Sequence, residues 1–151
     1  MLPLWLGKVG YIITRPGVYA LIRFTRRSYV VIRVKDEIIV IKDWLDMHKI
    51  WRLPGGGVKR SETPKIGAKR ELKEEVGINI DVNGLKLIKK GVHPSLKYRF
   101  WVYELKLDKK PSISINRYEL ADARWISIKN IANQPKVYEI TQYLYKTKAY
   151  Q

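Results

Sequence analysis

Three glutamates, Glu71, Glu74 and Glu75, have the residue type and spacing that metal-assisted chemistry uses. In a helix, positions i, i+3 and i+4 share one face, so their carboxylates would lie together. Each like-charged pair at this spacing costs an isolated helix about 0.2–0.5 kcal/mol, and the negative end of the helix dipole is close. A bound Mg²⁺ would remove this conflict, because it binds carboxylate oxygens and bridges them to substrate phosphates. The alternative is a solvated helix face whose acids are balanced by surface lysines.

The segment that carries these glutamates has clear helix boundaries. Thr63 suits the N-cap, and Pro64 suits the first helical position, where its missing N–H group is no loss. Gly77 suits the left-handed position that ends a helix. The apolar residues that such a helix would bury recur every four positions and are Ala68, Leu72 and Val76.

The flanks of this helix complete a recognisable motif. Its specified positions are filled in order by Gly56, Glu62, Arg70-Glu71-Leu72, Glu74-Glu75 and Gly77-Ile78. This pattern resembles the complete Nudix box, and Leu53–Gly57 resembles the loop that precedes the box. Three successive glycines in that loop let a ligand approach the main chain closely. By this resemblance, which covers roughly residues 28–148, the chain is identified as a member of the Nudix hydrolase family.

The resemblance implies a fold and a set of roles. The fold would be a Nudix-type α/β/α sandwich, of α/β class with a mixed (α+β) sheet, whose catalytic loop and helix occupy residues 54–77. The cofactor would be Mg²⁺, with Mn²⁺ as a substitute, lowering the pKa of a bound water that attacks phosphorus. Arg70 would orient a neighbouring glutamate, and Glu62 would brace the loop–helix junction. The implied metal ligands are Glu71, Glu74, Glu75 and a main-chain carbonyl of Gly55 or Gly56.

Two further groups of candidates lie outside the motif. Glu119 precedes Trp125 in a segment similar to the family pattern that supplies a late carboxylate, so it is a candidate metal ligand or general base. Asp122 competes for that role, and a solvated loop acid is the plain alternative. For substrate stacking the candidates are Trp44, Trp51 and Tyr98, although most aromatic residues belong to a core or an amphipathic surface.

The motif does not specify a substrate. Pro94 stands at the offset past Ile78 that the family associates with ADP-ribose cleavage, which favours a nucleoside diphosphate linked to another group, of the ADP-ribose or nucleotide-sugar type. A nucleoside triphosphate or an RNA 5′ end is the alternative substrate; the net charge of +16 would suit RNA, but no RNA-binding module is recognisable. A different class of function is a Nudix fold that only binds a nucleotide or a membrane surface.

The elements that must position these residues follow from hydrophobic periodicity. Helices on both sides of a mixed sheet are the natural arrangement for this pattern. The expected strands are Tyr29–Val34 with Ile38–Ile41, Ile78–Val82 with Leu85–Lys89 as a second hairpin, Lys97–Leu107 covered on both faces, and a short Arg124–Ser127. A loop is expected over 44–51 and an amphipathic helix over 136–148.

Length and composition set the remaining bounds. The 151 residues suit one domain, residues 28–151, after an extension of residues 1–27. The absence of cysteine excludes thiol chemistry and agrees with a reducing cytoplasm, the expected location. The charged residues of the extension are all cations, set among apolar residues too interrupted for a transmembrane span. The extension would pack on the domain or on a second subunit, as in a homodimer; peripheral contact with a membrane is the alternative.

Overall fold

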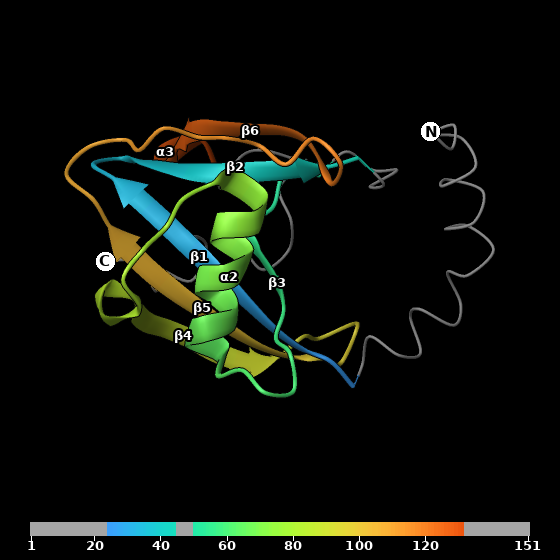
Figure 1. Cartoon of the computed structure of the whole chain (residues 1–151). Helices are drawn as coiled ribbons and strands as arrows, with labels where there is room; N and C mark the ends of the chain where they lie inside the picture. Colours follow the sequence, from blue (N-terminus) through green and yellow to red (C-terminus); the bar gives the residue numbers. More distant parts are fainter. Residues whose placement is uncertain (1–23, 45–49, 132–151) are drawn as a thin grey trace.

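The computed structural model of the chain describes residues 24–44 and 50–131, and within them the strands form one mixed sheet (Figure 1). The sheet has six strands in the order β4-β5-β1-β2-β6, with the short β3 paired to β1. Neighbouring strands are antiparallel except for β1 and β5, which are parallel. The strands are β1 (Arg26–Val34), β2 (Glu37–Asp43), β3 (Gly55–Gly57), β4 (Lys86–Val92), β5 (Arg99–Lys106) and β6 (Leu120–Ser127).

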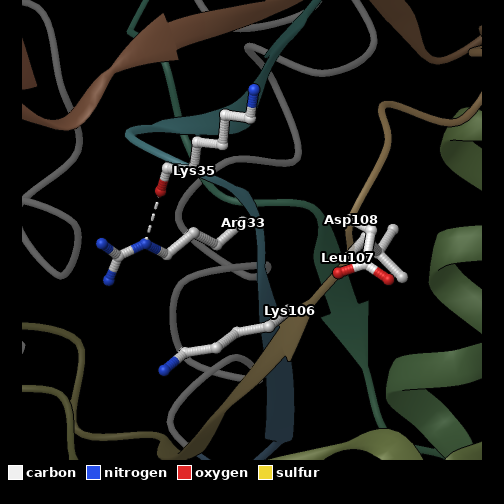
Figure 2. Close-up of a pocket in the computed structure, with 5 residues that line it drawn as sticks. All are labelled: Arg33, Lys35, Lys106, Leu107 and Asp108. Carbon is white, nitrogen blue, oxygen red and sulfur yellow. Dashed lines mark hydrogen bonds between the residues drawn. The ribbon is translucent and has the colours of Figure 1, made fainter.

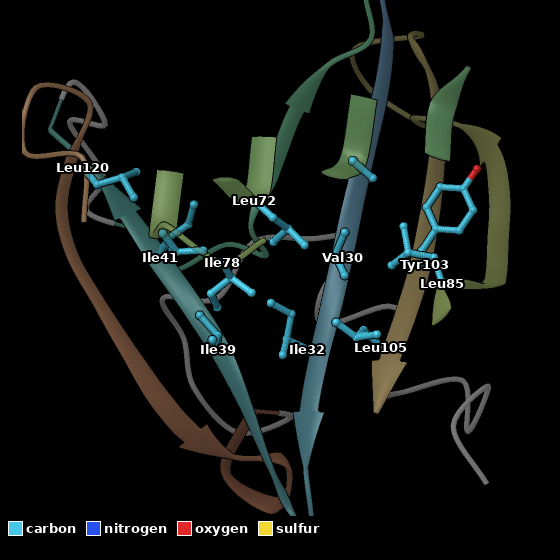
Figure 3. Close-up of a cluster of buried hydrophobic side chains, with 12 residues drawn as sticks. Val30, Ile32, Ile39, Ile41, Leu72, Ile78, Leu85, Tyr103, Leu105 and Leu120 are labelled. Carbon is cyan, nitrogen blue, oxygen red and sulfur yellow. The ribbon is translucent and has the colours of Figure 1, made fainter. Parts of the chain in front are cut away.

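The helix α2 (Pro64–Val76) lies across one face of this sheet (Figure 1). Its boundaries confirm the sequence prediction: the Thr63 side chain accepts from the Ile66 N–H group, and Gly77 ends the helix with φ 71°. The buried apolar side of α2 faces a core made with the strands (Figure 3). This core contains Val30, Ile32, Ile39, Ile41, Ala68, Leu72, Val76, Ile78, Leu85, Tyr103, Leu105 and Leu120.

The opposite face of the sheet carries a second cluster of buried apolar residues. It contains Tyr29, Val31, Ile38, Val40, Trp51, Leu53, Tyr98, Phe100 and Val102. Strand β5 contributes to both clusters, with Phe100 and Val102 on one face and Tyr103 and Leu105 on the other. The prediction that this strand is covered on both sides is therefore confirmed.

The first predicted hairpin is confirmed by β1 and β2, but the second is wrong. Residues 78–81 form no strand, and Val82–Gly84 is a 3-10 helix, η1, whose first N–H groups are capped by the Asp81 side chain. Ile78 and Leu85 enter the core beside α2, and β4 pairs with β5 instead. Strand β6 also begins earlier than expected, at Leu120, because it pairs with β2 along its length.

The chain after β6 forms a short helix, α3 (Ile128–Ile131). The predicted helix over 136–148, most of the loop over 44–51 and nearly all of the 1–27 extension lie outside the described residues. Strand β1 already begins at Arg26. None of the described helices combines the length and the apolar character needed to cross a bilayer.

Candidate active site

The glycine loop runs beside β1 at a separation that a side chain would prevent. In β3, Gly55 pairs with Tyr29 and Gly56 pairs with Ser28. Gly55 has φ 134°, and a Cβ there would lie 2.1 Å from the Ser28 carbonyl oxygen. A Cβ on Gly56 would lie 2.6 Å from Oε2 of Glu71. These two glycines therefore allow the loop to fit between β1 and the carboxylate side of α2.

Arg70 ties this loop to the helix carboxylates. Its Nε and Nη2 donate to the two oxygens of Glu62 at 2.8 and 3.1 Å, and Nη2 also donates to the Gly57 carbonyl at 2.7 Å. Its Nη1 donates to Glu71 and to Glu74, at 2.8 Å in each case. A planar guanidinium can serve all these acceptors at once, which a lysine ammonium cannot do in this geometry. Arg70 thus gathers three carboxylates of the motif around one cation.

Glu62 has a defined place at the junction between loop and helix. Besides Arg70, its carboxylate accepts from the Lys59 N–H group at 3.0 Å. The hydrogen bond from Arg70 is the largest influence on Glu62 and lowers its pKa from 4.5 to about 2. Glu62 is therefore ionised at neutral pH and positioned to brace the junction.

Arg26 holds the same loop from the side of β1. Its Nη2 donates to the carbonyl of Lys59 at 2.7 Å and lies 3.4 Å from the carbonyls of Arg60 and Glu62. Its own carbonyl accepts from the Val58 N–H group at 2.8 Å. The loop that enters α2 is consequently fastened between two arginines, Arg26 on the strand and Arg70 on the helix.

The third glutamate of the cluster points in a different direction. Glu75 is buried, at 3% exposure. Its Oε1 accepts from Nη2 of Arg52 at 2.8 Å, and its Oε2 accepts from the Gly55 N–H group at 2.7 Å. Arg52 also binds Asp43 through two hydrogen bonds of 2.7 Å. Glu75 therefore fixes the start of the glycine loop from inside the protein.

Burial changes the proton affinity of two of these glutamates. Burial raises the pKa of Glu75 to about 7, although Arg52 and the Gly55 N–H group favour the ionised form. Burial also raises the pKa of Glu71, against the opposing hydrogen bond from Arg70. Both shifts express the cost of carboxylate charge in a partly desolvated place, which a nearby cation would reduce.

The carboxylate oxygens of these glutamates meet the requirements of a hard divalent cation only in part. Mg²⁺ needs only one or two carboxylates, because it keeps several waters and binds substrate phosphates. Glu71 and Glu74, which converge on Arg70 beside Gly56, offer such a pair. As the side chains lie, no trio of histidine or acidic side chains among the described residues would hold a metal. Glu75 is bound by Arg52 and the Gly55 N–H group, whereas Glu71 and Glu74 are bound by Arg70.

The late carboxylates follow a segment that contacts the C-terminal end of α2. The Asn116 N–H group donates to the Glu75 carbonyl at 3.0 Å, and the Glu119 N–H group donates to the Asn116 carbonyl at 3.1 Å. The Glu119 side chain is exposed. Asp122 is partly exposed and pairs with Arg124 at 2.9 Å. Glu119 is thus placed in a turn fastened to the catalytic helix, and its role in catalysis stays a prediction.

The three predicted stacking residues occupy different surroundings. Trp44 is 46% exposed and lies directly after β2. Trp51 is buried in the second cluster, with the cations of Lys42 and Arg124 over its ring at 4.9 and 4.0 Å. Tyr98 is 1% exposed. Only Trp44 therefore offers an open ring to a ligand in this structure.

The buried Tyr98 belongs to the turn that contains Pro94. Its hydroxyl lies 3.0 Å from that of Tyr29, and its ring packs on His93. The His93 Nδ1 accepts from the Ser95 and Leu96 N–H groups and so closes the turn that joins β4 to β5. This turn lies near the beginning of β1, at the end of the sheet that carries the glycine loop, because β1 and β5 are parallel.

A cavity of about 360 Å³ lies at the other end of β1 (Figure 2). It is lined by Arg33, Lys35, Lys106, Leu107 and Asp108. The Arg33 Nε donates to the Lys35 carbonyl at 2.8 Å, and this contact shapes its wall. None of the predicted site residues lines this cavity, so it is separate from the candidate site formed by the glycine loop and α2.

Comparisons with known proteins show the family of the chain. The model of the NUDIX domain matches residues 23–147. The chain therefore belongs to the Nudix family. An RNA pyrophosphohydrolase of Bartonella clarridgeiae is 32% identical over 83 residues, which cover 55% of this chain and 42% of that protein. The chain spans less than half the length of the curated relatives that it matches.

Solved structures show the same fold. The MutT protein of Methanosarcina mazei Go1 superposes with a TM-score of 0.67 at 18% identity, over 85% of this chain and 96% of that one. A bifunctional NMN adenylyltransferase/ADP ribose pyrophosphatase of Francisella tularensis has a TM-score of 0.72 at 22% identity, over 94% of this chain and 46% of that one. The predicted fold class, a mixed sheet with a helix in an α+β sandwich, is thereby confirmed.

Proposed function

We propose that the protein is a Mg²⁺-dependent hydrolase that cleaves a phosphoanhydride bond in a nucleoside diphosphate linked to another group. The observation that carries this proposal is the Arg70 network, which holds Glu62, Glu71 and Glu74 against the glycine loop. Family membership and the curated relatives with pyrophosphohydrolase names support the reaction class.

The residues divide the work of this reaction between binding and positioning. Glu71 and Glu74 would hold the cation. The Gly55 or Gly56 carbonyl and Glu75 would be its further ligands. The cation would neutralise phosphate charge and make a bound water more acidic. Arg70 orients the two carboxylates, and the glycines let the phosphates approach the main chain. Glu119 is the candidate to accept the proton of the attacking water.

The substrate proposal favours the ADP-ribose or nucleotide-sugar type. Pro94 supports it by its offset from the motif and by its place in the turn at the same end of β1 as the glycine loop. The name of one protein with a similar fold, the bifunctional NMN adenylyltransferase/ADP ribose pyrophosphatase of Francisella tularensis, includes this activity. The similarity to that protein is one of fold.

An RNA 5′ end is the second candidate. It is favoured by two curated relatives named RNA pyrophosphohydrolase and by the net charge of +16. A positively charged protein attracts any polyanion at long range and raises its local concentration. The charge alone therefore does not select RNA over a small nucleotide.

Product analysis with a panel of substrates separates the two candidates. Purified full-length protein with Mg²⁺ would be given ADP-ribose, nucleotide sugars, nucleoside triphosphates and 5′-triphosphorylated RNA. Conversion of ADP-ribose to AMP and ribose 5-phosphate as the fastest reaction supports the proposal. Faster release of pyrophosphate from RNA would replace it with the second candidate, and inactivity on the whole panel would refute both.

The dependence of KM and affinity on salt concentration provides an independent test with the same substrates. A small nucleotide touches few cations, so its KM should rise only modestly between low and physiological salt. RNA that contacts several phosphate-binding residues should lose affinity with a log–log slope of about −0.7 per neutralised phosphate. We expect the shallow dependence for the preferred substrate.

A further inference from the structure

Trp44 and the turn of residues 117–119 contact each other beside the candidate site, and we call this contact region the seam. Each side of the seam contributes an aromatic side chain. Trp44 follows the last residue of β2, and the turn of residues 117–119 precedes β6. The Trp44 N–H group donates to the Glu119 carbonyl at 3.1 Å, and the indole Nε1 donates to the Arg117 carbonyl at 3.0 Å. The backbone and the ring of Trp44 are both fixed against the turn.

The turn that receives Trp44 is itself held in a defined shape. The Asn116 side chain accepts from the Tyr118 N–H group at 3.2 Å. The Asn116 carbonyl accepts from the Glu119 and Leu120 N–H groups at 3.1 and 2.9 Å. These contacts place Tyr118 at the tip of the turn, with its side chain 95% exposed. A turn of this rigidity therefore presents an aromatic ring to solvent.

The exposure of both rings at one seam needs an explanation. Among the described residues only three aromatic side chains are exposed, Phe24, Trp44 and Tyr118, and two of these belong to the seam. Single exposed apolar residues are ordinary on protein surfaces, but neighbouring ones mark binding sites. An amphipathic ring held by a rigid loop loses little entropy when it stacks on a ligand, which makes aromatic residues good binding contacts.

The seam is connected to the catalytic helix by short contacts. Asp43, which precedes Trp44, accepts both hydrogen bonds from Arg52, and Arg52 binds Glu75. From the other loop, the Asn116 N–H group binds the Glu75 carbonyl. Asp43 and Asn116 are therefore both connected to Glu75, in the last turn of α2, through Arg52 and through the Glu75 carbonyl.

We propose that Trp44 and Tyr118 form a stacking platform for the base of the nucleotide, an inference that rests on the proposed function. The platform takes a planar aromatic group, and the carboxylates of α2 take the phosphates. A base has an apolar face that suits both rings, and stacking tolerates any base because each has a π face. The adjacent Arg117 is also exposed.

The test compares two ligands that differ only in the base. AMP and ribose 5-phosphate would each be titrated into the full-length protein while NMR follows the indole N–H signal of Trp44, assigned with Trp44→Phe. This N–H group is a suitable reporter because it donates to Arg117. AMP should shift the signal in a saturable manner, and ribose 5-phosphate should leave it in place.

Variants then identify the contact. Tyr118→Ala should weaken AMP binding about tenfold, the loss expected for one stacked base, with no change for ribose 5-phosphate. Tyr118→Phe keeps the ring and should bind AMP like the wild type. Phe24→Ala removes an exposed aromatic residue outside the seam and should also bind AMP like the wild type.

The kinetic outcomes separate this proposal from the proposed function. If the protein hydrolyses ADP-ribose and Tyr118→Ala raises KM about tenfold at unchanged kcat, both stand. If hydrolysis proceeds but Tyr118→Ala leaves KM and AMP affinity unchanged, the platform is refuted and the function survives. Equal shifts of the Trp44 signal by both ligands would show phosphate recognition and refute the platform. If no nucleotide is bound or hydrolysed, both proposals are refuted.

Discussion

The Nη2 of Arg52 lies 2.8 Å from the Oε1 of Glu75, so that a buried carboxyl group of α2 is paired with a cation from the strand side of the candidate site. Burial opposes the charge on Arg52, but the carboxylates of Glu75 and Asp43 outweigh this effect and raise its pKa. The Arg52 Nη1 also donates to the Gly55 carbonyl at 2.9 Å. This contact makes Arg52 a structural support of the glycine loop.

Replacing Arg52 with alanine should destabilise the fold strongly. The change would leave Glu75, Asp43 and the Gly55 carbonyl without the donor that they share, which should cost about 2 kcal/mol or more although Glu75 can take up a proton. Guanidinium chloride denaturation measures the difference. The matched control is Lys110→Ala, which breaks the exposed pair with Glu37 and should cost less than about 1 kcal/mol. Equal losses in the two variants would contradict the support assigned to Arg52.

A methyl group on Gly56 should impair catalysis more than stability. The added Cβ would lie 2.6 Å from the end of the Glu71 side chain, which is flexible enough to move away. Displacing a metal-binding carboxylate by about 1 Å can cost about a hundredfold in rate. Gly57→Ala is the control, since a Cβ at Gly57 meets nothing within 4 Å. The prediction fails if Gly56→Ala and Gly57→Ala have the same kcat.

Arg70 should not be replaceable by lysine. Lysine keeps the charge but cannot reach Glu62, Glu71, Glu74 and the Gly57 carbonyl together. Arg70→Lys should therefore lower both the melting temperature and kcat, and Arg70→Ala should lower them further. A lysine variant that matches the wild type in calorimetry and in rate would show that Arg70 is only a solvated helix cation.

Glu62 should give the fold a defined sensitivity to acid. Its pKa is about 2 in the folded protein and 4.5 as the ordinary value. A carboxylate with a lowered folded pKa stabilises the fold above pH 4.5, and this contribution disappears as the pH falls from 4.5 towards 2. The wild type should exceed Glu62→Gln by on the order of 1 kcal/mol at pH 7.

The comparison of the two proteins at several pH values tests the sign of this effect. The difference in their free energies of unfolding, measured with urea, should be constant from pH 7 to 5 and shrink below pH 4.5. A difference that stays constant down to pH 3, or grows, would mean that Glu62 is not held ionised by Arg70.

Much of the catalytic segment could be predicted from the sequence because its signals are local. Thr63, Pro64 and Gly77 act within one turn of α2, so their residue types alone set its ends. The Asn83–Gly84 pair misled the prediction of a hairpin, because the nearby Asp81 caps a 3-10 turn instead. The conformation of such a short segment depends on which strand its neighbour pairs with, and β4 pairs with β5.

The inward orientation of Glu75 could not be predicted with the same ease. Its spacing from Glu71 suggested a shared face, but Glu75 also stands three residues after the buried Leu72 and next to Val76, at the edge of the buried stripe. Its partner Arg52 is distant in the sequence and is one of 30 basic residues. Only the fold shows which of these cations faces the helix.

We propose that Glu71 and Glu74 bind the divalent cation that drives phosphoanhydride hydrolysis. Glu74 gives the most direct test, because its side chain is 50% exposed and glutamine should not disturb the fold. The rate of hydrolysis of ADP-ribose and of the other substrates in the panel would be measured with Mg²⁺ and with EDTA. The proteins compared are the wild type, Glu74→Gln and the surface control Glu37→Gln. EDTA should abolish activity, Glu74→Gln should lower kcat by about a hundredfold or more, and Glu37→Gln should match the wild type. Full activity of Glu74→Gln, or activity that persists in EDTA, would contradict the proposed metal site.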